Sequence, residues 1–190
     1  MIRDQLLIAG AGGQGALRIG QMIAHAAMNE GFEVEWLPSY GAEMRGGTAN
    51  CAVNISDTEI LCCMVTNPDC LIVMNDLSLA RFGASVRSGG TIILNSTLIK
   101  ERVAEDNLNV YYIPADLIAE EEDNLRGANM VMLGVYIAVS GRIPAAAVYE
   151  IIDQSFTGTK AKYAVSNKRL VERGITYIEG QLQKEKREGV

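Results

Sequence analysis

The spacing of hydrophobic residues near the start of the chain predicts a strand, a helix and a second strand. Residues 5–9 form an apolar run that ends abruptly in glycines, which is typical of a buried strand turning into a helix. Within residues 14–30 the apolar positions recur at helical spacing, and Gly31 provides a stop. Residues 32–37 then alternate between apolar and polar side chains, as in a strand with one partly hydrated face.

Two further strand-like runs follow the second predicted strand, of which residues 49–55 alternate between apolar and polar side chains. Residues 49–55 and 59–65 are both rich in β-forming residues, and a Ser-Asp-Thr turn separates them. Because this connection is short, we predict an antiparallel hairpin over residues 49–65. A hairpin here would interrupt a strictly alternating order of strands and helices. The expected fold is therefore α/β, with a Rossmann-like sheet that is mainly parallel and antiparallel in this part.

The rest of the chain predicts three short strands and then a helical C-terminal third. Strands are expected at residues 70–75, 91–95 and 110–113, and helices at 128–140, 144–156 and 162–186. The helix at 128–140 is almost wholly apolar, which indicates burial, and Gly134 in its middle suggests close packing at that position. We predict a single domain over residues 1–190.

Composition narrows the functional classes without changing this fold. The formal net charge is −6, and a basic block is missing, which argues against a nucleic-acid partner. The sequence has no apolar run of the roughly 18 residues that span a bilayer, so we expect no membrane partner. It also begins without the pattern of a secretory signal, and we expect a cytoplasmic protein.

The cysteines and the histidine do not suggest a metal site. The four cysteines occur in apolar, strand-like runs, at Cys51, Cys62, Cys63 and Cys70. Their spacing differs from the Cys-x-x-Cys pattern of zinc and iron–sulfur sites. We expect reduced thiols that behave as small core residues. His25 is the one histidine, and its place in a helical pattern predicts a position on a helix face.

A glycine loop after the first strand is the first candidate site. It consists of Gly10, Gly12, Gly13, Gln14 and Gly15. A Gly-x-Gly-x-x-Gly pattern between a strand and a helix is compatible with dinucleotide binding, in which backbone N–H groups hold the pyrophosphate. Glu33 or Glu35 would then hold a ribose. The alternative is a turn that only lets the helix pack closely on the sheet, and the sequence leaves both interpretations open.

A second candidate loop, residues 38–47, follows the second predicted strand. Its candidate contact residues are Ser39, Tyr40, Glu43, Arg45, Gly46 and Gly47. Arg45 can make bidentate contacts with a phosphate or a carboxylate, and the glycines allow close backbone approach. Arg45 could equally pair with Glu43 or with an acid of a partner protein. Because the carboxyl ends of parallel strands share an edge, we expect both loops on one rim of the sheet.

A catalytic set is missing from the sequence. We find no nucleophile motif, no paired histidines, no clustered metal ligands and no Walker lysine after the glycines. The residues alone therefore leave two hypotheses: a stand-alone NAD(P)- or FAD-binding protein, or a binding scaffold that self-associates.

Three segments together resemble the gamma subunit of the 2-oxoacid:ferredoxin oxidoreductases. They are Gly-Ala-Gly-Gly-Gln-Gly at 10–15, Pro-Ser-Tyr-Gly-Ala-Glu-Met-Arg-Gly-Gly at 38–47, and Cys-Ala-Val-Asn-Ile-Ser-Asp at 51–57. The likeness covers nearly the whole chain, continuing through Pro68-Asp69, Gly89-Gly90, Asn129 with Gly134, and Asn167 with Gly174.

The resemblance implies a non-catalytic subunit of an enzyme that converts a 2-oxoacid and coenzyme A into an acyl-CoA, CO₂ and reduced ferredoxin. Thiamine diphosphate and iron–sulfur clusters would reside in alpha, beta and ferredoxin-like delta subunits. The gamma part would pack against the catalytic subunits and help shape the coenzyme A approach. The form of the second loop resembles the 2-oxoglutarate, ketoisovalerate and pyruvate branches, of which we rank 2-oxoglutarate first. An exposed docking surface also predicts that the isolated chain self-associates.

Overall fold

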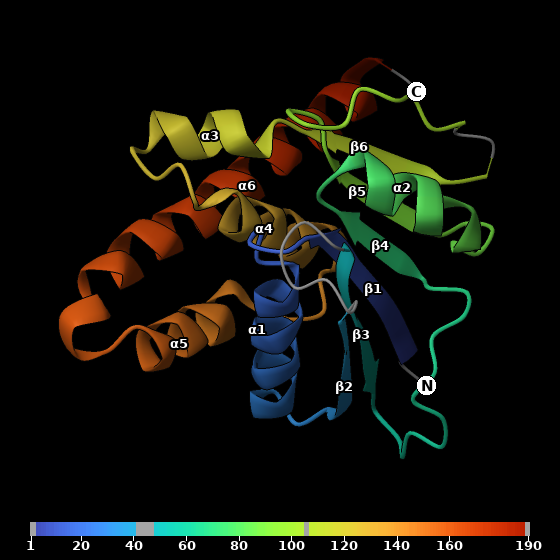
Figure 1. The fold of residues 1–190 in the computed structure, drawn as a ribbon, viewed down its shortest axis with the longest axis horizontal. Helices are drawn as coiled ribbons and strands as arrows, with labels where there is room; N and C mark the ends of the chain where they lie inside the picture. Colours follow the sequence, from blue (N-terminus) through green and yellow to red (C-terminus); the bar gives the residue numbers. More distant parts are fainter. Residues whose placement is uncertain (1–2, 41–47, 105–106, 189–190) are drawn as a thin grey trace.

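A six-stranded sheet organises the molecule, with helices on both of its faces (Figure 1). The computed structural model describes residues 3–40, 48–104 and 107–188. In spatial order β2-β3-β1-β4-β5-β6, the strands are β2 (Glu33–Tyr40), β3 (Thr48–Ser56), β1 (Arg3–Ala11), β4 (Cys70–Val73), β5 (Thr91–Asn95) and β6 (Asn109–Ile113). The parallel pairs β1–β4, β4–β5 and β5–β6 confirm a mainly parallel sheet.

The helices divide between the two faces of the sheet. Leu6 and Ile8 of β1 contribute to the larger core with α1 (Ala16–Asn29), α4 (Ala128–Ser140), α5 (Ala145–Ser155) and α6 (Lys162–Glu188). Leu7 points to the smaller core on the other face, which includes Leu79 of α2 (Asp76–Phe82). Further short helices are α3 (Ala115–Glu121), η1 (Gly83–Ser85) and η2 (Gly158–Lys160). Over the described ranges, no helix is long and apolar enough to cross a membrane.

The predicted hairpin over residues 49–65 is wrong in its second half. β3 forms as expected, but it pairs antiparallel with β1 on one side and with β2 on the other. Both of its edges are therefore occupied, and residues 59–65 adopt no strand. Instead, the Asn54 side chain of β3 donates a hydrogen bond to the carbonyl of Cys63 at 2.9 Å.

The prediction that the four cysteines lie in the core is confirmed for two of them and wrong for the other two. Cys51 and Cys70 lie in strands and are buried, as expected of small core residues. Cys62 and Cys63 are exposed, so their predicted place in the core is wrong, because the strand that would have buried them does not form. His25 is exposed on α1, which confirms its place on a helix face.

Two glycines let α4 and α6 pack with their backbones in contact. An ideal Cβ on Gly134 of α4 would lie 2.0 Å from the backbone oxygen of Val171 in α6. Conversely, a Cβ on Gly174 of α6 would lie 2.2 Å from the backbone oxygen of Val131 in α4. The close packing predicted at Gly134 is confirmed. The apolar helix α4 is buried along most of its length between the sheet and α6.

Candidate functional site

The carboxyl ends of β1 and β2 lie at the same edge of the sheet. Ala11 at the end of β1 pairs with Thr48 at the start of β3, and Tyr40 at the end of β2 pairs with Ala49. The chain ends of both strands therefore emerge on one rim, as the sequence predicts. Ser39 is exposed there. The other second-loop candidates Glu43, Arg45, Gly46 and Gly47 lie outside the described residues.

The glycine loop turns from β1 into α1 through two glycines in the left-handed conformation. Gly13 and Gly15 adopt the left-handed conformation, with φ of 96° and 79°. Gly15 is the N-cap of α1, and the first turn of that helix contains no acidic side chain. The first backbone N–H groups of a helix have no partner within it and carry its positive dipole end. Gly12 and Gly13 are exposed, so an anion could approach this turn.

Gln14 fastens the loop to the neighbouring strand. Its Oε1 accepts hydrogen bonds from the backbone N–H of Ala11 at 2.6 Å and from Nδ2 of Asn75 at 3.2 Å. Its Nε2 donates to the carbonyl of Met74 at 3.2 Å. The side chain thus joins the end of β1 to the segment following β4, and it shapes the loop from behind.

Two of the glycines are also required for packing. A Cβ on Gly10 would lie 2.9 Å from Cβ of Met74, and a Cβ on Gly15 would lie 2.4 Å from Nδ2 of Asn129. A Cβ on Gly13 would meet nothing within 4 Å. The packing interpretation therefore accounts for Gly10 and Gly15, whereas the open position of Gly13 fits access to the backbone.

The acidic residues expected to hold a ribose are in the wrong place. Glu33 starts β2 and pairs with Ser56, at the opposite end from the rim, and Glu35 pairs with Asn54. In a dinucleotide-binding sheet the ribose acid follows a parallel strand beside the first strand. Here the antiparallel β3 occupies that position. This geometry argues against the stand-alone NAD(P) or FAD hypothesis.

A cavity of about 470 Å³ adjoins the loop at Gly15. Its lining includes Arg18, Asn124, Arg126, Asn129, Phe156 and Tyr163. Asn129 also packs on Gly15, so the loop and the cavity share a wall. Sequence reasoning missed Arg18, Asn124, Arg126, Phe156 and Tyr163, because they come from separate segments without a motif. Asn167 also lines the cavity. The sequence indicates Asn129 and Asn167 only through the family resemblance.

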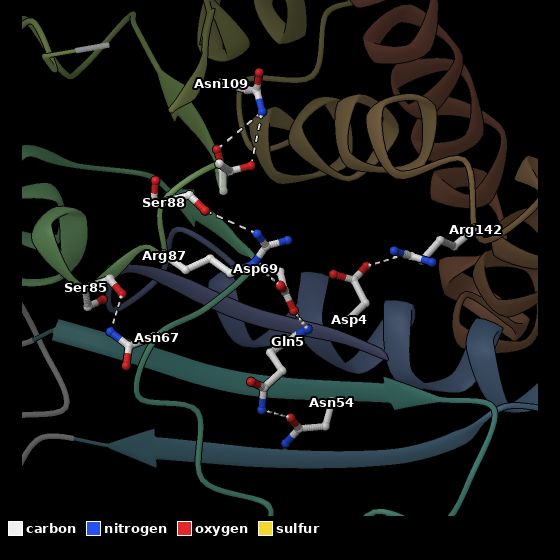
Figure 2. A network of polar contacts seen from close by, with 12 residues as sticks. Asp4, Gln5, Asn54, Asn67, Asp69, Ser85, Arg87, Ser88, Asn109 and Arg142 are labelled. Atoms are coloured by element: carbon white, nitrogen blue, oxygen red, sulfur yellow. Dashed lines mark hydrogen bonds and ion pairs between the residues drawn. The ribbon is translucent and has the colours of Figure 1, made fainter. Parts of the chain in front are cut away.

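A second polar cluster lies at the opposite end of the central strands from the rim, where β1 and β4 begin (Figure 2). Asp4, at the start of β1, accepts a hydrogen bond on Oδ2 from Tyr136 Oη at 3.0 Å and pairs with Arg142 Nε at 3.2 Å. Asp69 accepts the backbone N–H of Gln5 at 2.7 Å and pairs with Arg87. Asp69 thus joins the amino ends of β4 and β1, whereas Asp4 joins β1 to α4 and the segment after it, which indicates a structural role.

Burial raises the pKa of Asp4, and the hydrogen bond from Tyr136 and the charge of Arg142 offset only part of that increase. A carboxyl whose pKa is higher in the folded state stabilises the fold below its unfolded pKa of about 3.9. That stabilisation is lost as the pH rises through the folded pKa.

The variant Asp4→Asn tests the direction of this pH dependence. The stability of the natural chain relative to the variant is expected to fall as the pH rises above about 4, since the amide that replaces the carboxyl cannot ionise. Urea unfolding of both proteins between pH 4 and pH 7 measures the difference, and other titrating groups cancel in it. A difference that stays constant or increases with pH would contradict the raised pKa of Asp4.

The sheet and the helices on its faces define a Rossmann-like α/β fold. Among the described ranges, no three His, Cys, Asp or Glu side chains come together as potential metal ligands. The family model described as pyruvate ferredoxin/flavodoxin oxidoreductase matches residues 5–177, and the chain belongs to that family. The resemblance stated from the sequence is thereby confirmed.

Two curated relatives are similar to this chain over most of its length. Ketoisovalerate oxidoreductase subunit VorA of Methanothermobacter marburgensis is 38% identical over 180 residues, covering 94% of this chain and 37% of VorA. 2-Oxoglutarate synthase subunit KorC of the same organism is 34% identical over 169 residues, covering 85% of this chain and 91% of KorC. The chain thus spans little more than a third of VorA but nearly all of KorC.

A solved structure has the same fold. It is the 2-oxoglutarate:ferredoxin oxidoreductase from Magnetococcus marinus with 2-oxoglutarate, coenzyme A and succinyl-CoA bound. The TM-score is 0.86 at 22% identity, and the match covers 95% of this chain and 32% of that chain. In this neighbour, as in VorA, the matching domain is one part of a longer polypeptide.

Proposed function

We propose that this chain is the non-catalytic gamma component of a thiamine-diphosphate-dependent 2-oxoacid:ferredoxin oxidoreductase. It supports assembly with the alpha and beta subunits, and in some forms with a ferredoxin-like delta subunit. The family match over residues 5–177 carries this proposal. Ferredoxin would accept electrons from the complex rather than from this chain.

In this proposal the cofactors of the reaction belong to the partner subunits. The described residues do not fit an iron–sulfur cluster, because they bring no three potential ligands together. We therefore assign iron–sulfur clusters to the other subunits, and we assign thiamine diphosphate there as well, as the family resemblance implies. Coenzyme A, whose thiol would receive the acyl group, fits better, since the exposed turn at Gly12 and Gly13 can approach a phosphate. The rim would form one wall of its path.

The substrate is a 2-oxoacid, and 2-oxoglutarate is the first candidate. KorC supports this choice because it matches along 91% of its own length. VorA supports ketoisovalerate as the second candidate. The substrate pocket would lie mainly in other subunits.

Co-purification from the native cell tests the proposed function. The chain is expected to elute with a protein that contains thiamine diphosphate and iron. The complex is expected to reduce a dye when 2-oxoglutarate and coenzyme A are both present, with ketoisovalerate and pyruvate assayed in parallel. A chain that elutes alone, with no oxoacid-dependent dye reduction in its fractions, would refute the proposal.

Arg45→Ala tests the part of the proposal that concerns the second loop. In the reconstituted complex this change is expected to abolish assembly or to lower coenzyme A-dependent turnover by about tenfold or more, because a bidentate charged contact is lost. The isolated variant should unfold at the same temperature as the natural chain. Lys184→Ala, an exposed change on α6, is the control. Unchanged turnover in the Arg45 variant would remove this loop from the functional site.

A further inference from the structure

The cavity beside Gly15 has the composition of a protein-docking site. Its lining includes Arg18, Arg126, Met130, Phe156 and Tyr163. Arginine, methionine and aromatic residues are the types enriched at protein–protein interfaces. Buried aromatic and arginine side chains also carry much of the binding energy at such interfaces.

The mouth of this cavity leaves apolar surface in water. Leu125, in the connection between α3 and α4, is 74% exposed, and Tyr163 at the start of α6 is 48% exposed. Both line the cavity, whose inner wall includes the buried Met130. Covering apolar side chains at the entrance of a preformed cavity of about 470 Å³ is favourable, because their surface leaves water.

The same mouth is basic, although the whole chain has a net charge of −6. Arg126 makes no hydrogen bond or ion pair with any residue in the described ranges. The Arg18 guanidinium lies 5.4 Å from the centre of the Phe156 ring, and the Lys162 ammonium lies 5.1 Å from that of Tyr163. The lining contains one carboxylate, that of Asp123. The Arg18 guanidinium also donates a hydrogen bond to Oε1 of Gln21 at 3.2 Å, and its other N–H groups, like those of Arg126, can pair with an acidic partner.

We propose that this cavity docks an acidic segment of a catalytic partner subunit. An apolar or aromatic side chain of that segment enters between Phe156 and Tyr163, and an adjacent carboxylate pairs with Arg18 and Arg126. The inference rests on the function proposed above. Since Asn129 both lines the cavity and packs on Gly15, docking there also holds the wall of the glycine loop in place.

The test is the affinity of this chain for the separately purified remainder of the oxidoreductase. The double variant Arg18→Glu, Arg126→Glu is expected to bind at least about 100-fold more weakly, because each lost charge pair weakens an interface by about tenfold or more. Leu125→Ser, a change at an exposed position, should also weaken binding without disturbing the fold. The control Lys184→Glu, Arg187→Glu changes the net charge equally at the far end of α6 and should bind normally.

The outcomes separate this inference from the proposed function. Normal binding of both cavity variants overturns the docking site and leaves the proposed function intact. Equal weakening by the control pair shows general electrostatics and also overturns it. Normal assembly with loss of coenzyme A binding would make the cavity a small-molecule site instead. A natural chain that binds none of the other subunits overturns both proposals.

Discussion

Gly134→Ala is expected to lower the free energy of unfolding by about 3 kcal/mol, the upper end of the range for overpacked cores. The new Cβ would lie 2.0 Å from the backbone oxygen of Val171. That oxygen belongs to α6, so a side-chain rotation cannot relieve the overlap. The two helices must separate, and the buried side chains of α4 would lose contacts along their length.

Gly180→Ala is the matched control for this prediction. Gly180 lies in α6, and its ideal Cβ has no atom within 4 Å. Alanine favours the helix by about 1 kcal/mol over glycine, so this variant should be slightly more stable than the natural chain. Denaturant unfolding followed by circular dichroism compares the two. Equal stabilities of the variants at positions 134 and 180 would contradict the close contact between α4 and α6.

Gly15→Ala is expected to cost about 2 kcal/mol, in two parts. The backbone at position 15 is left-handed, with a φ of 79°, and this conformation costs about 1–2 kcal/mol for a residue other than glycine. The Cβ would also lie 2.4 Å from Nδ2 of Asn129, which must move into the adjoining cavity. The change therefore perturbs the glycine loop and the proposed docking site together.

Two companion variants separate these parts. Gly13→Ala has a φ of 96° and no atom within 4 Å of its Cβ, so it measures conformational strain alone, about 1 kcal/mol. Asn129→Ala removes the side chain that the new Cβ at position 15 would displace, so Gly15→Ala should cost less in that background. Unfolding free energies of the natural chain, the two single variants and the double variant complete the cycle. Strict additivity of the changes at 15 and 129 would show that the two residues do not interact.

The sequence predicts the glycine loop well because its signals are local. An apolar run, a group of glycines and a helical repeat follow one another, and each acts on its own few residues. Which residues pack against the loop is not determined locally. Whether Gly15 serves a ligand or a neighbour depends on Asn129, which arrives from α4 more than a hundred positions later.

The hairpin prediction fails because strand pairing is not a local property. The run of β-forming residues at 59–65 is a real β signal, but a strand needs a free partner edge. β1 and β2 fill both edges of β3, and the local pattern of residues 59–65 does not show that β1, from the start of the chain, takes the second edge. The exposure of Cys62 and Cys63 follows from that single fact.

The sequence by itself determined the class of fold, because hydrophobic periodicity and glycine turns act over short stretches, and it determined the family through the resemblance of the segments at 10–15, 38–47 and 51–57. Only the tertiary structure decided which strand lies beside β1, and hence that Glu33 and Glu35 are away from the rim. It also decided that Arg18, Arg126 and Tyr163 share one cavity. These outcomes depend on packing between segments far apart in the chain, which no local pattern records.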